Sequence, residues 1–198
     1  MVTKAALRKE MKQRLESLPP EKFHEEGLQA ASRIRSLPLW SQYETILFYL
    51  SMNLEIDTEP LLETSFLDKK KIFVPKVAGE DLHFFRIYSL SGPWHYGAFA
   101  IREPQTDRPE DLLQAQDFPV LIIVPGVAFT KEGDRMGHGR GYYDRFFESL
   151  DKQRLSYSTL GICMEAQIVP EVPTEKWDKK MDALCFGGNK PPLSGGLP

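Results

Sequence analysis

Short continuous apolar runs mark the predicted strands of this chain. They cover residues 45–50, 120–124, 158–163 and 183–186. A nearly continuous run such as 45–50 indicates a strand buried on both faces, as in a parallel sheet. Two further strands are predicted at 71–77 and 81–88. The intervening Gly79-Glu80-Asp81 is typical of a turn, which favours an antiparallel pair.

The first predicted helix covers residues 3–18. Thr3 is suited to cap it, and an apolar stripe follows at spacings of three and four: Leu7, Met11, Leu15 and Leu18. Lys4, Arg8 and Lys12 form a basic ridge beside the stripe. Such a ridge is compatible with a solvated surface or with a phosphate held elsewhere in the protein, and the pattern does not choose between them.

The remaining elements follow from the same periodicities. A second helix is predicted over 21–35 after Pro19-Pro20, and its inner side is expected to be Phe23, Gly27, Leu28, Ala31 and Ile34. A third helix is predicted over 59–67. A plain interpretation of the residues before it is that Thr58 caps this helix and the preceding acids are solvated. Residues 92–97 are expected to form a loop, 101–104 an extended segment and 108–114 a short helix.

The segment 125–150 combines a glycine-rich loop with a helix. It follows the apolar run 120–124, and glycines stand at positions 133, 137, 139 and 141. From Tyr142 onward the pattern is helical, with an apolar face made of Tyr143, Phe146, Phe147 and Leu150. The predicted order is therefore a buried strand, a glycine-rich loop and a helix.

This order is suited to binding a phosphate group. A helix N-terminus attracts anions, and glycines allow the backbone to approach a ligand closely. Arg135 and Arg140 supply positive charge, and Asp144, one turn into the helix, is suited to Mg²⁺. Two plainer interpretations remain open, namely a simple connector and an ordinary surface pair between Arg140 and Asp144. The loop matches neither a Walker A motif nor the dinucleotide fingerprint.

Three other groups of residues are candidates for a site. Met52 and Glu55 follow the run 45–50, and ligands of open α/β sheets lie beyond the carboxyl ends of strands. Asp178 and Asp182 precede the last strand, where they could join a metal site or act as solvated turn residues. His138 lies within the glycine-rich loop, where it could contact a phosphate or a nucleotide or be merely exposed.

Composition excludes several classes of protein. The formal net charge of −3 argues against a general nucleic-acid binder. Cys163 and Cys185 lack the spacing of a metal site and are expected to be buried thiols. No run reaches the length of a membrane span, so a cytoplasmic location without membrane contact is expected. The composition of residues 189–198 predicts a disordered tail.

Several of these segments together resemble one known family. The residues are Pro125-Gly126-Val127-Ala128-Phe129, then Gly133-Asp134-Arg135-Met136-Gly137-His138-Gly139-Arg140-Gly141-Tyr142-Tyr143-Asp144, with Phe48-Tyr49-Leu50-Ser51, Val74-Pro75 and Glu103-Pro104 elsewhere. They resemble the signature of 5-formyltetrahydrofolate cyclo-ligases, also called methenyltetrahydrofolate synthetases. The resemblance extends over nearly the whole chain.

The resemblance implies a fold and a reaction. The fold is a three-layer α/β/α sandwich with a mostly parallel sheet, like NagB, ribose-5-phosphate isomerase and CoA-transferases, in one domain over residues 1–188. The reaction uses ATP and Mg²⁺ to convert 5-formyltetrahydrofolate to 5,10-methenyltetrahydrofolate, ADP and phosphate. A monomer that binds only small molecules is expected.

The resemblance also implies roles for individual residues. Arg140 and Tyr142 are expected to be catalytic, with Tyr142 beside the formyl group. The metal ligands are expected to be Asp144 and Asp178, with Asp182 as the alternative second acid. ATP is expected to contact Lys4, Ala5, Ala6, Leu7, Arg8, Arg135, Met136, Gly137, His138, Gly139, Arg140, Gly141, Tyr142 and Tyr143. The folate is expected to contact Leu50, Met52, Glu55, His138, Gly139, Arg140, Gly141 and Tyr142.

Two other functions remain as alternatives. One is a different small-molecule kinase or ligase on the same fold, and the presence of Glu55 and Tyr142 argues against it. The other is a non-catalytic member that binds a nucleotide, folate or RNA as a regulator. Loss of Asp144 or of the two arginines would have favoured that function, and all three residues are present.

Overall fold

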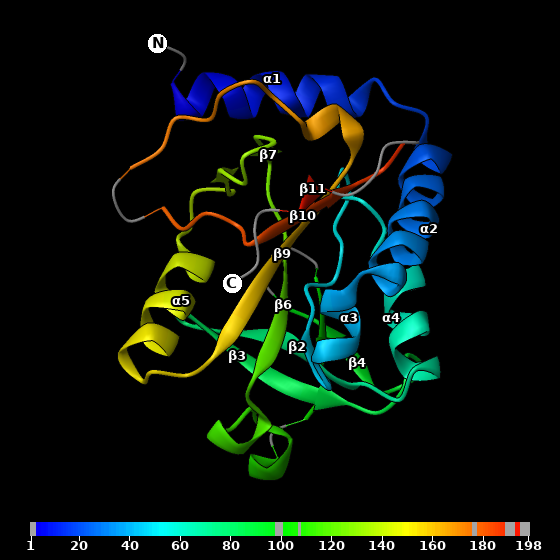
Figure 1. Ribbon diagram of the computed structural model, residues 1–198, viewed down its shortest axis with the longest axis vertical. Helices are drawn as coiled ribbons and strands as arrows, with labels where there is room; N and C mark the ends of the chain where they lie inside the picture. The colour runs from blue at the N-terminus through cyan, green and yellow to red at the C-terminus, as the bar shows by residue number, and fades with distance from the viewer. Residues whose placement is uncertain (1–2, 98–100, 107, 176–177, 189–192, 195–198) are drawn as a thin grey trace.

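A sheet of seven strands forms the centre of the computed structural model, which describes residues 3–97, 101–106, 108–175, 178–188 and 193–194 (Figure 1). The strand order is β11-β10-β9-β6-β1-β2-β3. The bounds are β1 Thr45–Leu47, β2 Lys71–Ala78, β3 Asp81–Ile87, β6 Val120–Val124, β9 Tyr157–Cys163, β10 Ala183–Phe186 and β11 Leu193–Ser194. The inner strands are parallel, and β3 and β11 at the edges are antiparallel. The prediction of a mostly parallel sheet is confirmed.

Helices cover both faces of this sheet. The bounds are α1 Lys4–Glu16, α2 Pro20–Ser36, α3 Pro38–Gln42, α4 Glu59–Leu67 and α5 Tyr142–Lys152. In Figure 1, α2, α3 and α4 lie on the right of the sheet, α5 lies on the left, and α1 crosses above its upper end. The predicted α/β fold with three layers is confirmed. The closer likeness to NagB and CoA-transferases stays a prediction.

The strands are buried because their side chains alternate between two cores. Ile46 and Ile123 pack with residues of α2, α3 and α4, whereas Leu47 and Ile122 pack with residues of α5. All five residues of β6 are buried. This double burial explains why the strands are continuous apolar runs rather than alternating patterns.

The first helix and the turn between two strands match their predictions. Thr3 caps α1, since its hydroxyl accepts a hydrogen bond from the backbone N–H of Ala6 at 3.2 Å. The stripe Leu7, Met11 and Leu15 is buried. The β2–β3 pair is antiparallel, and Gly79 takes a positive φ of 64° in its turn.

Four local predictions need correction. Leu28 is 51% exposed, because α2 turns Gly27, Ala30 and Ala31 inward instead. Residues 92–97 contain strand β4 (Trp94–Tyr96), which pairs with β5 (Arg102–Pro104). The segment 108–114 holds only a single 3-10 turn, Pro109–Asp111, and a second turn follows at Ala115–Asp117.

The fourth correction concerns the cap of α4. The Thr58 hydroxyl makes no capping bond and donates instead to the backbone carbonyl of Tyr49 at 3.3 Å. Instead of Thr58, the Asp57 carboxylate accepts a hydrogen bond from the backbone N–H of Glu59 at 2.9 Å. In the tail, Leu193–Ser194 form β11, and residues 189–192 and 195–198 lie outside the described part. Disorder of the tail stays a prediction.

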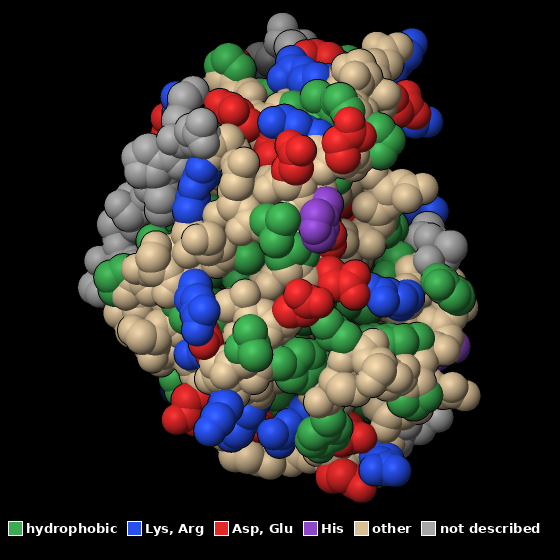
Figure 2. Space-filling view, turned by 90° about the vertical axis from the view of Figure 1, so that its right-hand side faces the viewer, with side chains coloured by type: hydrophobic (Ala, Val, Ile, Leu, Met, Phe, Trp, Pro, Cys, Tyr) green, Lys and Arg blue, Asp and Glu red, His purple; other side chains and the backbone are tan. Residues whose placement is uncertain are grey.

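The molecular surface mixes charges of both signs. On the face at the right of Figure 1, lysines and arginines are interspersed with aspartates and glutamates, and no large basic area gathers among the described residues (Figure 2). Within the described part of the chain, none of the helices is long and apolar enough to cross a membrane.

Gly27 lets α2 approach the loop that carries Met52 and Glu55. A Cβ atom at this position would lie 2.3 Å from the backbone oxygen of Asp57. We expect Gly27→Ala to destabilise the protein by about 1–3 kcal/mol through overpacking, although alanine favours helices by about 1 kcal/mol over glycine. Chemical denaturation measures the change. The exposed neighbour offers a control, since Leu28→Ala should change stability by less than about 0.5 kcal/mol; equal effects would contradict the packing argument.

Candidate functional site

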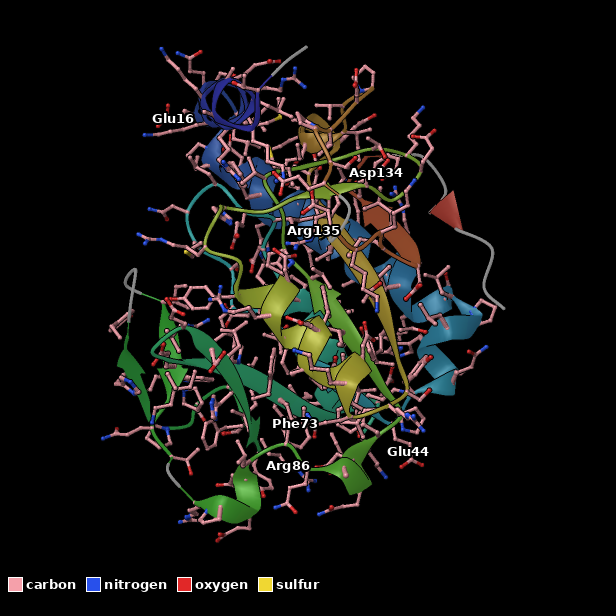
Figure 3. All side chains as sticks on the ribbon, turned by 90° about the vertical axis from the view of Figure 1, so that its left-hand side faces the viewer. Glu16, Glu44, Phe73, Arg86, Asp134 and Arg135 are labelled. Atoms are coloured by element: carbon pink, nitrogen blue, oxygen red, sulfur yellow. The ribbon has the colours of Figure 1, made fainter. Side chains whose placement is uncertain are left out.

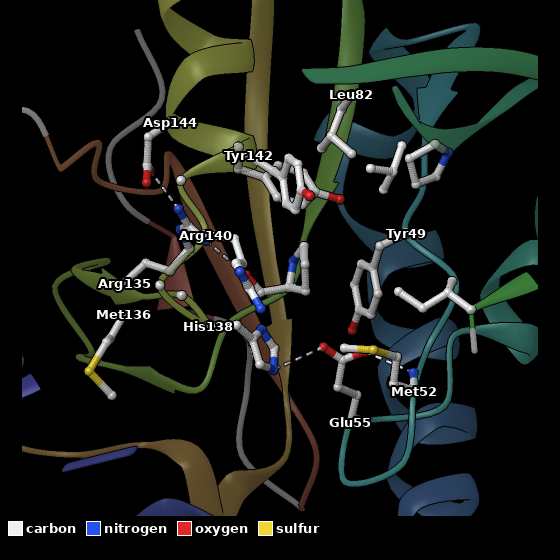
Figure 4. Close-up of a pocket in the computed structure, with 18 of the residues that line it drawn as sticks. Tyr49, Met52, Glu55, Leu82, Arg135, Met136, His138, Arg140, Tyr142 and Asp144 are labelled. Carbon is white, nitrogen blue, oxygen red and sulfur yellow. Dashed lines mark hydrogen bonds and ion pairs between the residues drawn. The ribbon is translucent and has the colours of Figure 1, made fainter. Parts of the chain in front are cut away.

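A pocket of about 670 Å³ lies at the carboxyl ends of the parallel strands. Its walls come from segments far apart in sequence: the start of α1, the loop after β1, the β2–β3 hairpin, the glycine-rich loop and the first turn of α5. Figure 4 shows Glu55 and Met52 on one side of this pocket, with His138, Arg140 and Asp144 on the other. The pocket lies where ligands bind in open α/β sheets.

The glycine-rich loop ends at the N-terminus of α5. Gly139 and Gly141 take positive φ angles of 95° and 70°, which side chains other than glycine rarely adopt. Gly141 is the N-cap residue, and it has no side chain with which to cap the first N–H groups of this 11-residue helix. A Cβ atom at Gly139 would lie 3.1 Å from the guanidinium of Arg8, which itself donates to the Gly137 carbonyl at 3.0 Å. The loop and α1 therefore pack against each other.

Arg135 and Asp144 form an ion pair in the pocket wall. Arg135 Nη2 donates to Asp144 Oδ1 at 2.8 Å, and the Arg135 side chain is only 7% exposed. Arg140 lies in the loop before α5 rather than on its face, and it is exposed. Asp144 is therefore paired with Arg135, the other arginine of the motif (Figure 4).

Lys4 connects α1 to the segment before β10. Its ammonium donates to Asp178 Oδ2 at 2.9 Å and lies 3.5 Å from Glu175 Oε1. Burial alone would lower the pKa of Lys4, but the two carboxylates outweigh it and raise this pKa. Asp182 has a different role, since its carboxylate accepts both the N–H and the hydroxyl of Thr159 and does not line the pocket.

Glu55 is a buried carboxyl in the opposite wall. Its Oε2 accepts the backbone N–H of Met52 at 2.8 Å, and the residue is 7% exposed. Burial raises the pKa of Glu55 to about 7, although the Met52 hydrogen bond acts in the lowering direction. Glu55 therefore changes charge near neutral pH, in a position where it can accept hydrogen bonds from a ligand.

His138 faces Glu55 across the pocket. Its Nε2 lies 3.8 Å from Glu55 Oε1 (Figure 4). Burial lowers the pKa of His138, and the nearby charges of Arg135 and Arg8 lower it further. Since the imidazole is then neutral at pH 7, this contact is a long polar contact rather than an ion pair.

Two tyrosines begin α5. Tyr142 packs against Arg145, whose guanidinium carbon lies 5.3 Å from the ring centroid. Tyr143 packs against Arg135 at 5.8 Å, and its buried hydroxyl has no hydrogen-bond partner among the residues that the structure describes. Burial and the Glu55 charge raise the pKa of Tyr143, so this hydroxyl stays protonated. It therefore keeps a hydrogen to donate.

The structure brings most of the predicted site residues together. Among the described residues, those that line the pocket include Lys4, Arg8, Leu50, Met52, Glu55, Arg135, Met136, Gly137, His138, Gly139, Arg140, Gly141, Tyr142, Tyr143, Asp144 and Asp178. Ala5 and Ala6 are exposed outside it, and Leu7 is buried in a separate cluster with Met11 and Met136. A helix turns only some successive residues toward one side, so the range 4–8 could not line the pocket as a whole.

Sequence reasoning gave no role to several other lining residues: Tyr49, Pro75, Val77, Leu82, Ile101, Glu103, Pro125, Glu175 and Lys179. Most come from β2, β3, β5 and the segment before β10. Their sequence signal is weak, because apolar strand residues and single surface charges have no distinctive spacing. Tyr49, Pro75 and Glu103 belong to segments that carry the family resemblance.

The carboxylates of the pocket are suited to Mg²⁺ when a phosphate ligand supplies further oxygens. Among the described residues, no group of three or more histidines, cysteines or acids is arranged to hold a metal by itself. Asp144 and Asp178 nevertheless line one pocket together with Lys4, Arg8, Arg135 and Arg140. Mg²⁺ is commonly held by one or two carboxylates plus the phosphate oxygens of a substrate. The donor set thus suits a metal that arrives with a nucleotide.

A second cavity of about 1200 Å³ adjoins the first. The two share Arg8, Leu50, Met52, Glu55, Ile101 and His138 in their walls. Beyond these residues, the second cavity reaches Lys12 and Phe23 on one side and Arg102 on the other. The shared walls allow one elongated ligand to extend from the first cavity into the second.

Known proteins resemble the chain over nearly its whole length. The model of the 5-formyltetrahydrofolate cyclo-ligase family matches residues 1–187. The 5-formyltetrahydrofolate cyclo-ligase of Escherichia coli K12 is 33% identical over 178 residues, which cover 88% of this chain and 94% of that protein. The probable 5-formyltetrahydrofolate cyclo-ligase of Schizosaccharomyces pombe is 30% identical over 169 residues, which cover 80% of this chain and 82% of that protein.

A solved structure resembles the fold to the same extent. The structure of 5,10-methenyltetrahydrofolate synthetase from Aquifex aeolicus is similar with a TM-score of 0.79 and 30% identity, and the match covers 100% of this chain and 96% of that one. The family model, the related sequences and this structure agree with the resemblance seen in the motif. The chain belongs to the 5-formyltetrahydrofolate cyclo-ligase family.

Proposed function

We propose that the protein is a 5-formyltetrahydrofolate cyclo-ligase, which uses ATP and Mg²⁺ to form 5,10-methenyltetrahydrofolate, ADP and phosphate. One observation carries the proposal beyond family membership. A single pocket combines the glycine-rich loop and two carboxylates with the wall formed by Leu50, Met52 and Glu55. A nucleotide and a second substrate can therefore meet in it.

The chemistry begins with activation of the formyl group. A formamide carbon is a poor electrophile until its oxygen becomes a leaving group. In the proposed reaction this oxygen takes the γ-phosphoryl group of ATP, and ADP leaves. N10 then forms a bond to the formyl carbon and loses its proton, and the C–O bond breaks to release phosphate. Such a phosphoryl transfer needs alignment and charge neutralisation rather than covalent help from the protein.

The residues around the loop supply these requirements. The uncapped N–H groups of α5 and the loop backbone suit the phosphates, and Lys4, Arg8, Arg135 and Arg140 add positive charge. Mg²⁺, when bound, would neutralise phosphate charge, and Asp144 and Asp178 would hold it. Tyr142, at the N-terminus of α5, is proposed to lie beside the formyl group.

The folate is proposed to bind across the facing wall. The Glu55 carboxylate suits the N–H donors of the pterin ring, and Leu50 and Met52 give apolar contact. The benzoyl-glutamate part of the substrate is proposed to extend into the adjoining cavity, past Lys12 and Arg102. Since one chain supplies all these walls, a monomer is proposed to be sufficient, and a cytoplasmic location accords with this substrate class.

Absorbance at the methenyl-folate band tests the proposal. We expect growth of the band after the protein is mixed with (6S)-5-formyltetrahydrofolate, ATP and Mg²⁺. The band should not grow when ATP is omitted, when Mg²⁺ is chelated, or when 5-methyltetrahydrofolate replaces the formyl substrate. No growth despite ATP binding by calorimetry would mean a different substrate, and absence of both would overturn the proposal.

A further inference from the structure

Both carboxylates proposed for Mg²⁺ are paired with cations proposed for phosphate. Asp144 accepts Arg135 Nη2 at 2.8 Å, and Asp178 accepts Lys4 Nζ at 2.9 Å. All four side chains line the 670 Å³ pocket. Glu175, which also lines the pocket, lies 3.5 Å from Lys4 as a second carboxylate near this cation. The protein without ligand therefore pairs these cations and carboxylates with each other.

These pairs are too enclosed to be ordinary surface pairs. Their side chains are 7% exposed for Arg135, 16% for Asp178, 27% for Lys4 and 34% for Asp144. Removing the partner of a largely buried charge is costly because the remaining charge is uncompensated. A ligand that takes one member of a pair as its own partner must therefore offer a group of opposite charge to the other member.

We propose that the two pairs make the site selective for the magnesium complex of the nucleotide over the free nucleotide. On binding, Lys4 and Arg135 exchange their carboxylate partners for phosphate oxygens, while Asp144 and Asp178 exchange theirs for Mg²⁺. The proposal rests on the proposed function, since it concerns the same nucleotide and metal. It adds a reason why the two ligands bind together.

Charge compensation explains the selectivity. Free ATP would attract Lys4 and Arg135 and leave two carboxylates facing a triphosphate, which is repulsive. Mg²⁺ alone would attract the carboxylates, which would leave Arg135 without its carboxylate and Lys4 with Glu175 alone, at 3.5 Å. Only the complex of Mg²⁺ and ATP offers phosphate oxygens to both cations and a metal ion to both carboxylates. Metal and nucleotide should therefore strengthen each other's binding, with a coupling of about 5- to 150-fold as is usual for linked sites.

Calorimetry with neutralised carboxylates tests the exchange. We expect Asp178→Asn and Asp144→Asn to bind ATP in the presence of a chelator about 10-fold more tightly than the wild type, because Lys4 or Arg135 loses its nearest carboxylate. The same variants should bind Mg-ATP more weakly. Loss of a proposed metal ligand would thus improve binding of the metal-free nucleotide, which a purely structural role of the carboxylates would not produce.

Glu148→Gln is a matched control. Glu148 lies one turn after Asp144 on the same helix and pairs with Lys152 at 2.7 Å outside the pocket. Its neutralisation changes the net charge equally, so its affinities for ATP and Mg-ATP should equal those of the wild type. Lys4→Met removes the cation of a pair instead of its carboxylate. Without Lys4, Asp178 should bind Mg²⁺ alone more tightly than in the wild type.

Each outcome separates the two proposals. Unchanged or weaker binding of metal-free ATP by both asparagine variants, with unchanged binding of Mg²⁺ by Lys4→Met, would overturn the exchange. If the wild type still binds Mg-ATP and forms the methenyl product, the proposed function stands in that case. A wild type that binds neither Mg-ATP nor free ATP would overturn both.

Discussion

Glu55→Gln is expected to make the protein more stable and its folate binding weaker. The pKa of Glu55 rises from an ordinary 4.5 to about 7 because the carboxyl is buried. Above pH 7 the folded state must hold a buried negative charge, which costs about 3 kcal/mol at about 1.4 kcal/mol for each pKa unit. Glutamine removes this cost and keeps an oxygen for the Met52 N–H.

The sign of the pH dependence follows from the raised pKa. Glu55 favours the folded state fully below pH 4.5, and this contribution disappears as the pH rises to about 7. The stability advantage of Glu55→Gln over the wild type should therefore grow from pH 4.5 to pH 7 and then remain constant. Chemical denaturation at pH 5 and pH 8 measures both ends of this range.

The catalytic efficiency of the wild type should change with pH in the opposite direction to its stability. In the proposed site the N–H donors of the pterin need an ionised Glu55 as acceptor, so kcat/KM of the wild type should rise with pH through about 7. Glutamine presents an amide N–H to these donors, and we expect a loss of about 10- to 100-fold in folate affinity, the usual effect of one charged hydrogen bond. In this variant, kcat/KM should also no longer change with pH near 7.

Glu26→Gln provides the comparison for this experiment. Glu26 is another buried carboxyl, 2% exposed, but its carboxylate accepts the Glu165 N–H and it lines neither of the two cavities. Its replacement should leave the KM for folate unchanged and give no gain in stability. A Glu55→Gln variant with wild-type KM, or with lower stability at pH 8, would contradict the role given to this carboxyl.

The local motif could be predicted from the sequence because its signals are short-range. Continuous apolar runs located β6 and β10, and the spacing of Tyr143, Phe147 and Leu150 predicted the inner face of α5. The glycines at 139 and 141 do adopt the positive φ angles that a close backbone turn requires. These features depend on residues within a few positions of each other.

Partners across the pocket could not be predicted in the same way. Arg140 and Asp144 have helical spacing, yet Asp144 pairs with Arg135, because the β7–β8 hairpin (Ala128–Phe129 and Arg135–Met136) returns Arg135 beside α5. Lys4 and Asp178 are 174 residues apart, and no periodicity connects them. The distinction between Asp178, which lines the pocket, and Asp182, which binds Thr159, likewise depends on the third dimension.

Arg140→Ala is expected to abolish most ATP-dependent turnover without loss of stability. The guanidinium lies in the pocket between two glycines, next to the N-terminus of α5. In the proposed reaction it stabilises the charge of the phosphoryl group during transfer. Removal of one such donor typically reduces kcat by about 10²- to 10³-fold.

The fold should tolerate this change for two reasons. Arg140 is exposed, and such positions usually alter stability by less than about 0.5 kcal/mol. Arg140 also contacts Arg145, and this contact uses its backbone carbonyl, at 3.0 Å, which alanine keeps. Thermal unfolding should therefore coincide with that of the wild type while turnover falls.

Two further arginine variants define what Arg140 contributes. Arg140→Lys keeps the charge but loses the planar pair of donors, so an intermediate rate would indicate bidentate phosphate binding. Arg86→Ala removes an arginine on β3 outside the pocket, at the end of the molecule away from Arg135 (Figure 3), and should retain the wild-type rate. If Arg140→Ala also retains the wild-type rate, its guanidinium takes no part in the reaction, and the phosphate must be held by the loop backbone with Lys4, Arg8 and Arg135 alone.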